Sequence, residues 1–235
     1  MEKFTKATTS QKPITKKSLF TSDEEEIINR ILFLKQNIKE LPSPTDYHEL
    51  GILYFKIKNY DKCIEILDEL QKKFPDYIDI SRAKKLRILA LIYKEQYQTA
   101  IKEIQERLQI EPQDVVLLSC LAYCYEKLND CKKALSIHKK ILQIEPEREA
   151  SLNAYGYLLA VCGKNEEDYK LAEKFVQRAL KKKPKNPYYL DSYAVVMLKL
   201  GKIQEAKEYI YQAYQLEPNN SEIQKHLQEI MMFVK

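Results

Sequence analysis

The stretch of chain between residues 115 and 148 limits the possible folds more than any other feature of the sequence. Apolar residues recur there at every third or fourth position in two runs, 118–125 and 134–144, which is the pattern of two amphipathic helices. Residues 129–130, Asn-Asp, form a turn between the two runs. Pro146 ends the second helix, because the residue before a proline is disfavoured in the helical conformation. The stretch is therefore predicted to be a pair of packed helices.

Particular residues in this stretch resemble those of a known repeat. Leu121-Ala122, Tyr125, Ala134 and Pro146 stand where the tetratricopeptide pattern has Leu-Gly, Tyr, Ala and Pro, and the stretch has the 34-residue length of that unit. The resemblance recurs along the chain and divides it into five expected repeats, at 44–77, 81–114, 115–148, 149–186 and 187–220. It implies an all-α, right-handed solenoid of helical hairpins that share one core. The composition agrees, since four glycines and 31% charged residues suit helices better than sheets.

Three segments outside the repeats complete the expected organisation. Residues 1–20 are polar and lack a hydrophobic period, so we expect a disordered, basic tail. Residues 21–43 are expected to form a helix that caps the first repeat. Residues 221–235 are expected to form a helix that caps the last one.

Two of the expected repeats depart from the regular length. Three extra residues, near 78–80, precede the second repeat, and they predict a local change in superhelical twist. The turn of this repeat, around Glu95 and Gln96, is predicted to be one residue short. In the fourth repeat, the turn between Cys162 and Asp168 is expected to be about four residues longer than the pattern requires.

The positive charge of the chain is concentrated in its first twenty residues. The net charge is +5, and residues 1–20 contain five lysines against Glu2 alone, so the remainder is almost neutral. A domain that binds duplex nucleic acid needs a basic surface. A nucleic-acid partner is therefore not expected for the repeats.

The lack of recognisable targeting signals in the sequence and the number of cysteines favour a cytoplasmic location. No run of about 18 apolar residues is present, so we expect no membrane-spanning segment. The N-terminal residues lack the apolar core of a secretory signal, and a transit peptide is disfavoured because they contain no arginine. Five cysteines, an odd number at helical core spacings, agree with a reducing compartment.

The resemblance implies that the first helix of each pair lines a concave groove. The inward positions of these helices are expected to be His48, Ile52, Phe55, Tyr93, Ser119, Tyr123, Asn153, Tyr157, Tyr188, Asp191 and Val195. Such a surface is aromatic and apolar with a few polar groups, which suits a peptide segment of another protein. Tyr123 and Tyr157 have an alternative role, packing against the next repeat. The lysine and asparagine pair with which some family members clamp a chaperone's C-terminal carboxylate is absent, so that clamp is not expected.

Residues that could support chemistry are few. Cys120, Cys124, Cys131 and His138 could be considered as zinc ligands, but buried packing positions explain them better, and we expect no metal site. The sequence contains no glycine-rich phosphate loop, no HExxH motif and no nucleophile elbow. Neither a cofactor nor catalytic activity is therefore expected.

The sequence thus predicts a non-catalytic adaptor or assembly factor that binds a peptide segment or a partner protein in the concave groove. One alternative is a client-specific chaperone of a secretion or membrane complex. A second alternative is an RNA-associated helical repeat protein, which the near-neutral repeats disfavour. A homodimer is compatible with all three.

Overall fold

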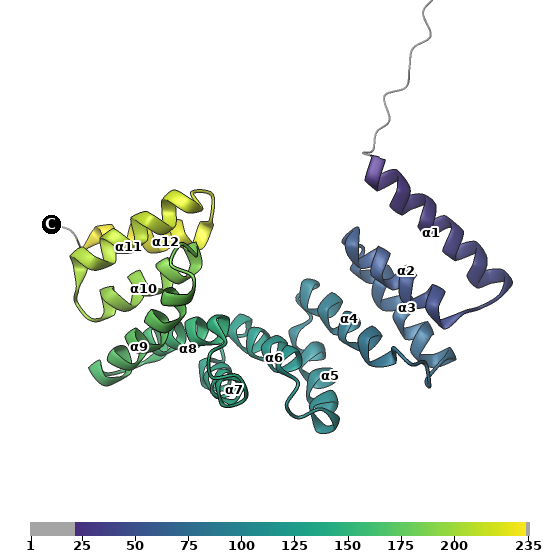
Figure 1. The fold of residues 1–235 in the computed structure, drawn as a ribbon, viewed down its shortest axis with the longest axis horizontal. Coiled ribbons are helices and arrows are strands. Elements are labelled where there is room, and N and C mark those ends of the chain that lie inside the picture. The colour runs from purple at the N-terminus through teal and green to yellow at the C-terminus, as the bar shows by residue number, and fades with distance from the viewer. Residues whose placement is uncertain (1–21, 234–235) are drawn as a thin grey trace, which may run out of the picture. The chain divides into compact units, whose positions relative to one another are not determined.

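The computed structural model describes residues 22–233, and within that range it consists of twelve helices without a strand (Figure 1). The predicted tail, 1–20, lies outside the described residues. In chain order the helices are α1 (Ser22–Glu40), α2 (Pro44–Lys56), α3 (Tyr60–Lys73), α4 (Ile80–Tyr93), α5 (Tyr97–Ile110), α6 (Val115–Lys127), α7 (Cys131–Ile144), α8 (Glu149–Cys162), α9 (Glu166–Lys182), α10 (Pro187–Lys199), α11 (Ile203–Leu216) and α12 (Ser221–Met232). The predicted all-α fold of helical hairpins is confirmed.

The chain divides into two compact units, Met1–Ile80 and Ser81–Lys235. The division falls at the three extra residues, 78–80, that interrupt the repeat spacing in the sequence. Each unit is described by itself, and the change of twist that these residues predict stays a prediction. The exact limits of the five repeats also stay a prediction.

The first unit contains the hairpin of α2 and α3, with α1 packed against α2. Ile31 and Leu34 of α1 bury their side chains against Leu50 and Leu53 of α2. A β-carbon on Gly51 would lie 2.7 Å from the Leu67 side chain, so a glycine at this position lets α2 and α3 approach closely. The hairpin is therefore held by close helix contact as well as by apolar burial.

The second unit contains the helices from α4 to α12. Within it, α6 packs on α7, α8 on α9 and α10 on α11, and each pair also contacts the next. Alanines at equivalent positions of the second helices, Ala100, Ala134, Ala172 and Ala206, are completely buried. These small side chains allow neighbouring helices to come close, which is how stacked hairpins form one continuous core.

Three-residue turns with one left-handed residue join four of the helix pairs. The left-handed residues are Lys58, Glu95, Asn129 and Gly201, with φ angles of 59°, 59°, 56° and 74°. The turn between α4 and α5, at 94–96, therefore has the same length and the same conformation as the others. The prediction that this turn is one residue short is wrong. It failed because glutamate, unlike glycine or asparagine, does not mark a left-handed position in a sequence.

The predicted long turn in the fourth repeat is mostly an extension of helix α9. Only residues 163–165 lie between α8 and α9, and α9 has 17 residues where α7 and α11 have 14. The Asn165 side chain accepts a hydrogen bond of 2.9 Å from the Asp168 backbone N–H and so begins the helix. Acidic residues in this first turn favour the positive end of the helix. The extra residues consequently form one more helical turn, and the predicted longer loop is wrong.

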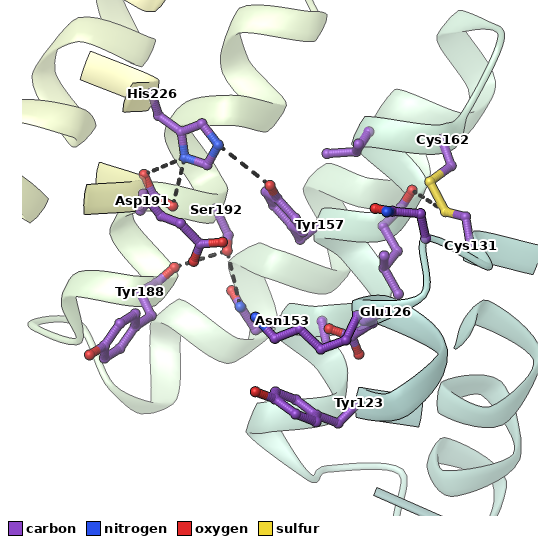
Figure 2. A pocket seen from close by; sticks show the side chains of 16 residues that line it. Tyr123, Glu126, Cys131, Asn153, Tyr157, Cys162, Tyr188, Asp191, Ser192 and His226 are labelled. Atoms are coloured by element: carbon purple, nitrogen blue, oxygen red, sulfur yellow. Dashed lines mark hydrogen bonds and ion pairs between the residues drawn. A yellow bond between two sulfur atoms is a disulfide. The ribbon is translucent and has the colours of Figure 1, made fainter. Parts of the chain in front are cut away.

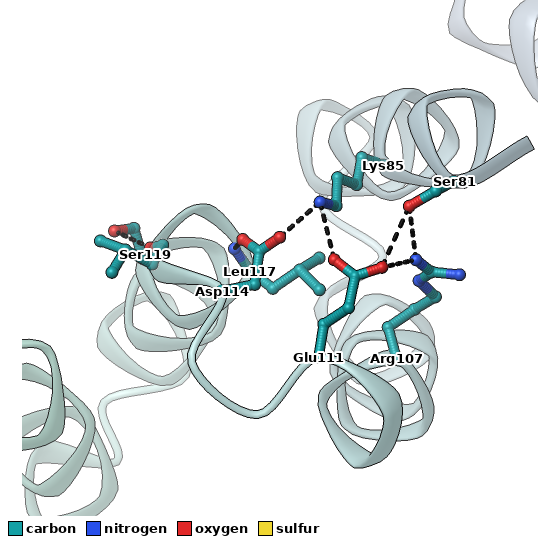
Figure 3. A network of polar contacts seen from close by, with 8 residues as sticks. Ser81, Lys85, Arg107, Glu111, Asp114, Leu117 and Ser119 are labelled. Carbon is teal, nitrogen blue, oxygen red and sulfur yellow. Dashed lines mark hydrogen bonds and ion pairs between the residues drawn. The ribbon is translucent and has the colours of Figure 1, made fainter. Parts of the chain in front are cut away.

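A polar network ties α4, α5 and α6 together (Figure 3). The Lys85 ammonium contacts Glu111 at 3.0 Å and also pairs with Asp114. Arg107 pairs with Glu111 and donates a hydrogen bond of 2.6 Å to the Ser81 hydroxyl. Burial opposes ionisation of Asp114, but hydrogen bonds from Lys85 and from the Leu117 N–H hold the pKa of this carboxyl below its usual value. Two cations and two carboxylates thus neutralise one another between the three helices.

A disulfide between Cys131 and Cys162 joins the first residue of α7 to the last residue of α8. The Cα atoms of the two cysteines are 6.6 Å apart. The other cysteines are thiols: Cys63 and Cys124 are buried, and Cys120 is half-buried. The five cysteines were expected to agree with a reducing compartment, and this bonded pair does not fit that expectation, because reducing compartments disfavour disulfides. Within the described range, none of the helices combines the length and the apolar composition needed to cross a membrane.

Candidate binding site

A cavity of about 570 Å³ opens on the second unit between α6, α8, α10 and α12 (Figure 2). Three of these are the first helices of successive pairs, and α12 follows the last pair. Within this group, α10 packs against both α8 and α12. The volume lies within the range of sites that bind small molecules or peptide side chains.

Five of the residues predicted from the sequence line this cavity. They are Tyr123 on α6, Asn153 and Tyr157 on α8, and Tyr188 and Asp191 on α10. The rings of Tyr123 and Tyr188 are 42% and 52% exposed, so both are available for contact. Tyr157 is half-buried and also lines the cavity, and its contact with a ligand stays a prediction.

Three further predicted residues of the second unit lie elsewhere. Val195 is buried and lines a smaller cavity of about 230 Å³, which Tyr157 and His226 also border. The Ser119 hydroxyl donates a hydrogen bond of 2.6 Å to the backbone oxygen of Val115, four residues earlier in the same helix. Tyr93, the last residue of α4, is 60% exposed.

The remaining predicted residues belong to α2 in the first unit. The His48 ring packs edge-on against Tyr77 with centroids 5.8 Å apart, and its Nδ1 lies 3.4 Å from the Tyr77 hydroxyl. Phe55 packs edge-on against Tyr60 with centroids 5.4 Å apart. Ile52 is 37% exposed. Whether these three residues of the first unit contact a ligand stays a prediction.

The cavity contains a histidine that the sequence did not identify as part of a site. His226 on α12 places its Nδ1 at 2.9 and 3.0 Å from the two carboxylate oxygens of Asp191, and its Nε2 at 3.4 Å from the Tyr157 hydroxyl. Burial disfavours the imidazolium form, but the hydrogen bond and the charge of Asp191 outweigh it, so the pKa of His226 is raised. Burial also raises the pKa of Tyr157 to about 12, and the nearby carboxylates add to this effect. Tyr157 is therefore a neutral phenol that shares a hydrogen bond with the imidazole.

A second set of polar groups in the cavity leaves one acceptor without a partner. Asn153 Nδ2 donates a hydrogen bond of 3.0 Å to the Ser192 hydroxyl, which donates one of 2.9 Å to the backbone oxygen of Tyr188. The Oδ1 atom of Asn153 is buried and has no hydrogen-bond partner among the described residues. A buried acceptor without a partner is costly, so this atom favours a ligand that brings a donor.

Charged groups on α6 and α12 complete the lining. Glu126 Oε1 lies 2.8 Å from Nε2 of the buried His138, and Glu222 contributes a carboxylate from the first turn of α12. The Lys127 ammonium lies 5.3 Å from the centroid of the Tyr123 ring. His138 and Cys131 are thus engaged with other partners, and no group of three or more potential ligands for a metal ion occurs within residues 22–233.

Comparisons with known proteins identify the repeat. A family model for the N-terminal tetratricopeptide repeat (TPR) region of Psidin matches residues 54–190, which is more than half of the chain. A second model, for the tetratricopeptide repeat itself, matches residues 192–220. A curated relative, TPR repeat-containing protein PA4667 of Pseudomonas aeruginosa, is 30% identical over 189 residues. The alignment covers 79% of this chain but spans only 30% of the length of the relative.

Solved structures show the same fold at low sequence identity. A tetratricopeptide repeat protein from Parabacteroides merdae superposes with a TM-score of 0.69 and 16% identity, over 81% of this chain and 73% of that protein. YrrB, described as a TPR protein with an unusual peptide-binding site, superposes with a TM-score of 0.61 and 15% identity, over 83% of this chain and 97% of YrrB. The helical hairpins, the buried alanines at equivalent positions and the family match over 54–190 agree. This chain belongs to the tetratricopeptide repeat family.

Proposed function

We propose that this protein is a non-catalytic adaptor or assembly factor, and that it holds a peptide segment of a partner protein in the cavity of the second unit. The TPR fold supports a role in protein interaction in general. One observation carries the more specific proposal. Five residues that the repeat register selects for groove contact, from three successive first helices, line a single cavity.

The chemistry of the cavity suits a peptide. Exposed tyrosine rings, here Tyr123 and Tyr188, provide large contact areas at a low cost in side-chain entropy. The Asn153 amide and the Asp191 carboxylate can fix the polar groups of a bound backbone or side chain. The peptide-binding site in the description of YrrB supports the proposal by analogy of fold only.

A peptide selection tests the proposal. The full chain, immobilised through a tag, selects binders from a random library of 12-residue peptides, and the affinity of enriched peptides is measured by fluorescence polarisation. Tyr123→Ala combined with Tyr188→Ala should weaken binding at least about tenfold, because both rings are exposed in the cavity. Tyr211→Ala is the matched control, because Tyr211 is 39% exposed but lies on α11, outside the cavity.

The peptide selection has outcomes that support groove binding and outcomes that reject it. Enriched peptides that lose affinity with the double variant and keep it with the control support groove binding. No enriched peptide, or equal losses with both variants, would reject it. Circular dichroism must show unchanged helix content for both variants.

The alternatives make different predictions. A client-specific chaperone should prevent the aggregation of one partner protein, which light scattering measures. The selection with short peptides does not test this activity. An RNA-associated role requires salt-sensitive binding to an oligonucleotide, and the carboxylates in the cavity oppose a phosphate ligand there. Cytoplasmic location belongs to the proposal and is tested by cell fractionation.

A further inference from the structure

We infer that the cavity of the second unit receives a lysine or arginine side chain of the bound peptide. The inference rests on the proposed function and specifies its ligand. Three properties of the cavity carry it: an excess of carboxylates from different helices, tyrosine faces beside them, and a buried acceptor without a donor.

The carboxylates come from three helices that are distant in sequence. Glu126 lies on α6, Asp191 on α10 and Glu222 on α12, and all three line the cavity. Only Lys127 and His226 offset them, and Lys127 is an exposed residue at the end of α6. The cavity therefore attracts cations and repels phosphates and carboxylates.

Asp191 contacts His226 through both of its carboxylate oxygens, but the other two carboxylates are only partly used by the protein itself. Glu126 uses Oε1 for its contact with His138. The Glu222 carboxylate forms no salt bridge with any residue in the described range, although its backbone N–H is capped by Asn220. Unpaired charge of this kind remains available to a ligand at little cost in desolvation, because Glu222 is exposed.

Aromatic faces beside the carboxylates favour a cation of the lysine or arginine type. Within the protein, the Lys127 ammonium already lies over the Tyr123 ring, with its nitrogen 5.3 Å from the centroid. This contact has the geometry of a cation–π interaction. Tyr188, which is 52% exposed in the same cavity, offers another ring. A guanidinium group gains most from this arrangement, since it can stack on a ring while it binds a carboxylate.

The Asn153 side chain adds a requirement for hydrogen-bond donors. Its Oδ1 atom is buried and has no partner within the described residues, while its Nδ2 is fixed by Ser192. Lysine and arginine side chains carry three and five N–H donors, respectively, and no acceptor. A basic side chain therefore matches the charge of the cavity and brings donors to the side where Asn153 lies.

Defined peptides test the inference. An enriched peptide from the selection above is resynthesised with citrulline in place of arginine, or acetyl-lysine in place of lysine, which keeps the shape and removes the charge. We expect affinity for the full chain to fall at least about tenfold. Glu222→Gln should weaken the charged peptide about fivefold but leave the neutral peptide unchanged, which a double-mutant cycle measures. Glu208→Gln is the matched control, because Glu208 is an exposed glutamate of α11 outside the cavity.

The outcomes distinguish the inference from the proposed function. Peptides that bind, lose affinity with Tyr123→Ala and Tyr188→Ala, and tolerate citrulline would overturn the inference and leave groove binding intact. A preference for the charged peptide that falls from about tenfold on the unmodified chain to about twofold on the Glu222→Gln variant supports it, whereas an unchanged preference would overturn it. An absence of any binding peptide rejects the proposed function itself.

Discussion

Two polar clusters of the second unit contain the same types of charged residue but differ in how completely these charges are paired. Between α4, α5 and α6, Lys85 and Arg107 pair with Glu111 and Asp114, and among the buried side-chain atoms of this network Nε of Arg107 lacks an acceptor within the described residues (Figure 3). In the cavity between α6, α8, α10 and α12, by contrast, the lining includes three carboxylates, of Glu126, Asp191 and Glu222, against the side chains of Lys127 and His226. Charge that is balanced inside the protein stabilises it. Charge that is left unbalanced beside a cavity is available to a ligand.

The two regions also differ in how neighbouring hairpins are joined. The ion pairs of Lys85 and Arg107 link the α4–α5 pair to α6. The cavity region instead has a covalent link, from Cys131 on α7 to Cys162 on α8, and both cysteines line the cavity. The bond therefore fixes the α6–α7 pair to the α8–α9 pair beside the cavity. The following experiments test this division of roles.

Removal of the disulfide should have the largest effect. Cys131→Ser with Cys162→Ser should lower the free energy of unfolding by about 3 kcal/mol, because the unfolded chain regains the freedom of a loop that the bond closes over a sequence separation of 31. Urea titration followed by circular dichroism measures the loss. Dithiothreitol should reduce the stability of the unmodified chain to that of the variant, and Cys120→Ser should leave this response in place. Stability that does not depend on dithiothreitol would refute a structural role for the bond.

Disruption of the ion-pair network should cause the second largest loss in the free energy of unfolding. Asp114→Ala should cost about 2 kcal/mol, because it removes both the acceptor of Lys85 and the cap of the Leu117 N–H at the start of α6. Asp114→Asn keeps a capping oxygen and should cost about half as much. The same urea titration compares the two. Equal costs for both substitutions would mean that the charge of Asp114 contributes nothing.

The His226–Asp191 contact should give a smaller, pH-dependent effect. Because the pKa of His226 is raised in the folded protein, the stabilisation is complete below the unfolded-state pKa near 6.5 and is lost as the pH rises through the folded-state pKa. The cost of Asp191→Asn should therefore be about 1 kcal/mol at pH 5.5 and less at pH 9. Glu222, Glu229 and Tyr157 also face the imidazole and do not reverse this sign.

An NMR titration provides the direct check on this contact. The imidazole resonances of His226 are assigned by comparison with a His226→Gln variant. The measured pKa of His226 should exceed 6.5 and should fall in Asp191→Asn. A value below 6.5 in the unmodified chain would show that burial outweighs the carboxylate.

Neutralisation of the free carboxylate in the cavity should have the smallest effect on stability. Glu222→Gln should change the free energy of unfolding by less than about 0.5 kcal/mol, because this exposed side chain forms no salt bridge with the described residues. The same variant should nevertheless weaken binding of a basic peptide. A large loss of stability would show that Glu222 stabilises the fold, as the ion pairs of Lys85 and Arg107 do. The two clusters would then not differ in their role.

The fold could be predicted from the sequence because each helix pair is specified by residues within a short stretch of chain. Helical spacing of apolar residues and terminating prolines such as Pro146 occur within each pair, and buried alanines such as Ala134 and Ala206 mark the helix contacts. The turn at Glu95 was missed because its conformation is enforced by the packing of the helices on either side and not by the residue itself. The extra turn of α9 was missed because spacing between prolines measures length and not conformation.

The site could be predicted only in part. Tyr123, Asn153 and Asp191 were identified because they occupy repeated positions in first helices. His226 lies on α12, which was expected to be a capping helix, so the inward positions of this helix were not counted among the groove residues. The link between Cys131 and Cys162 was missed because it depends on where the ends of two helices meet. The binding role of the predicted residues remains to be measured.

The disulfide also determines how this part of the chain responds to mechanical force. A protein built from stacked hairpins, pulled from its two ends, lengthens as successive hairpins detach from their neighbours. The segment between Cys131 and Cys162, with a sequence separation of 31, cannot contribute to that extension while the bond is intact. At about 3.4 Å per residue, this removes about 100 Å of contour length, which returns only after chemical reduction. The α8 side of the cavity would thus stay covalently linked to α7 under a load that separates other hairpins.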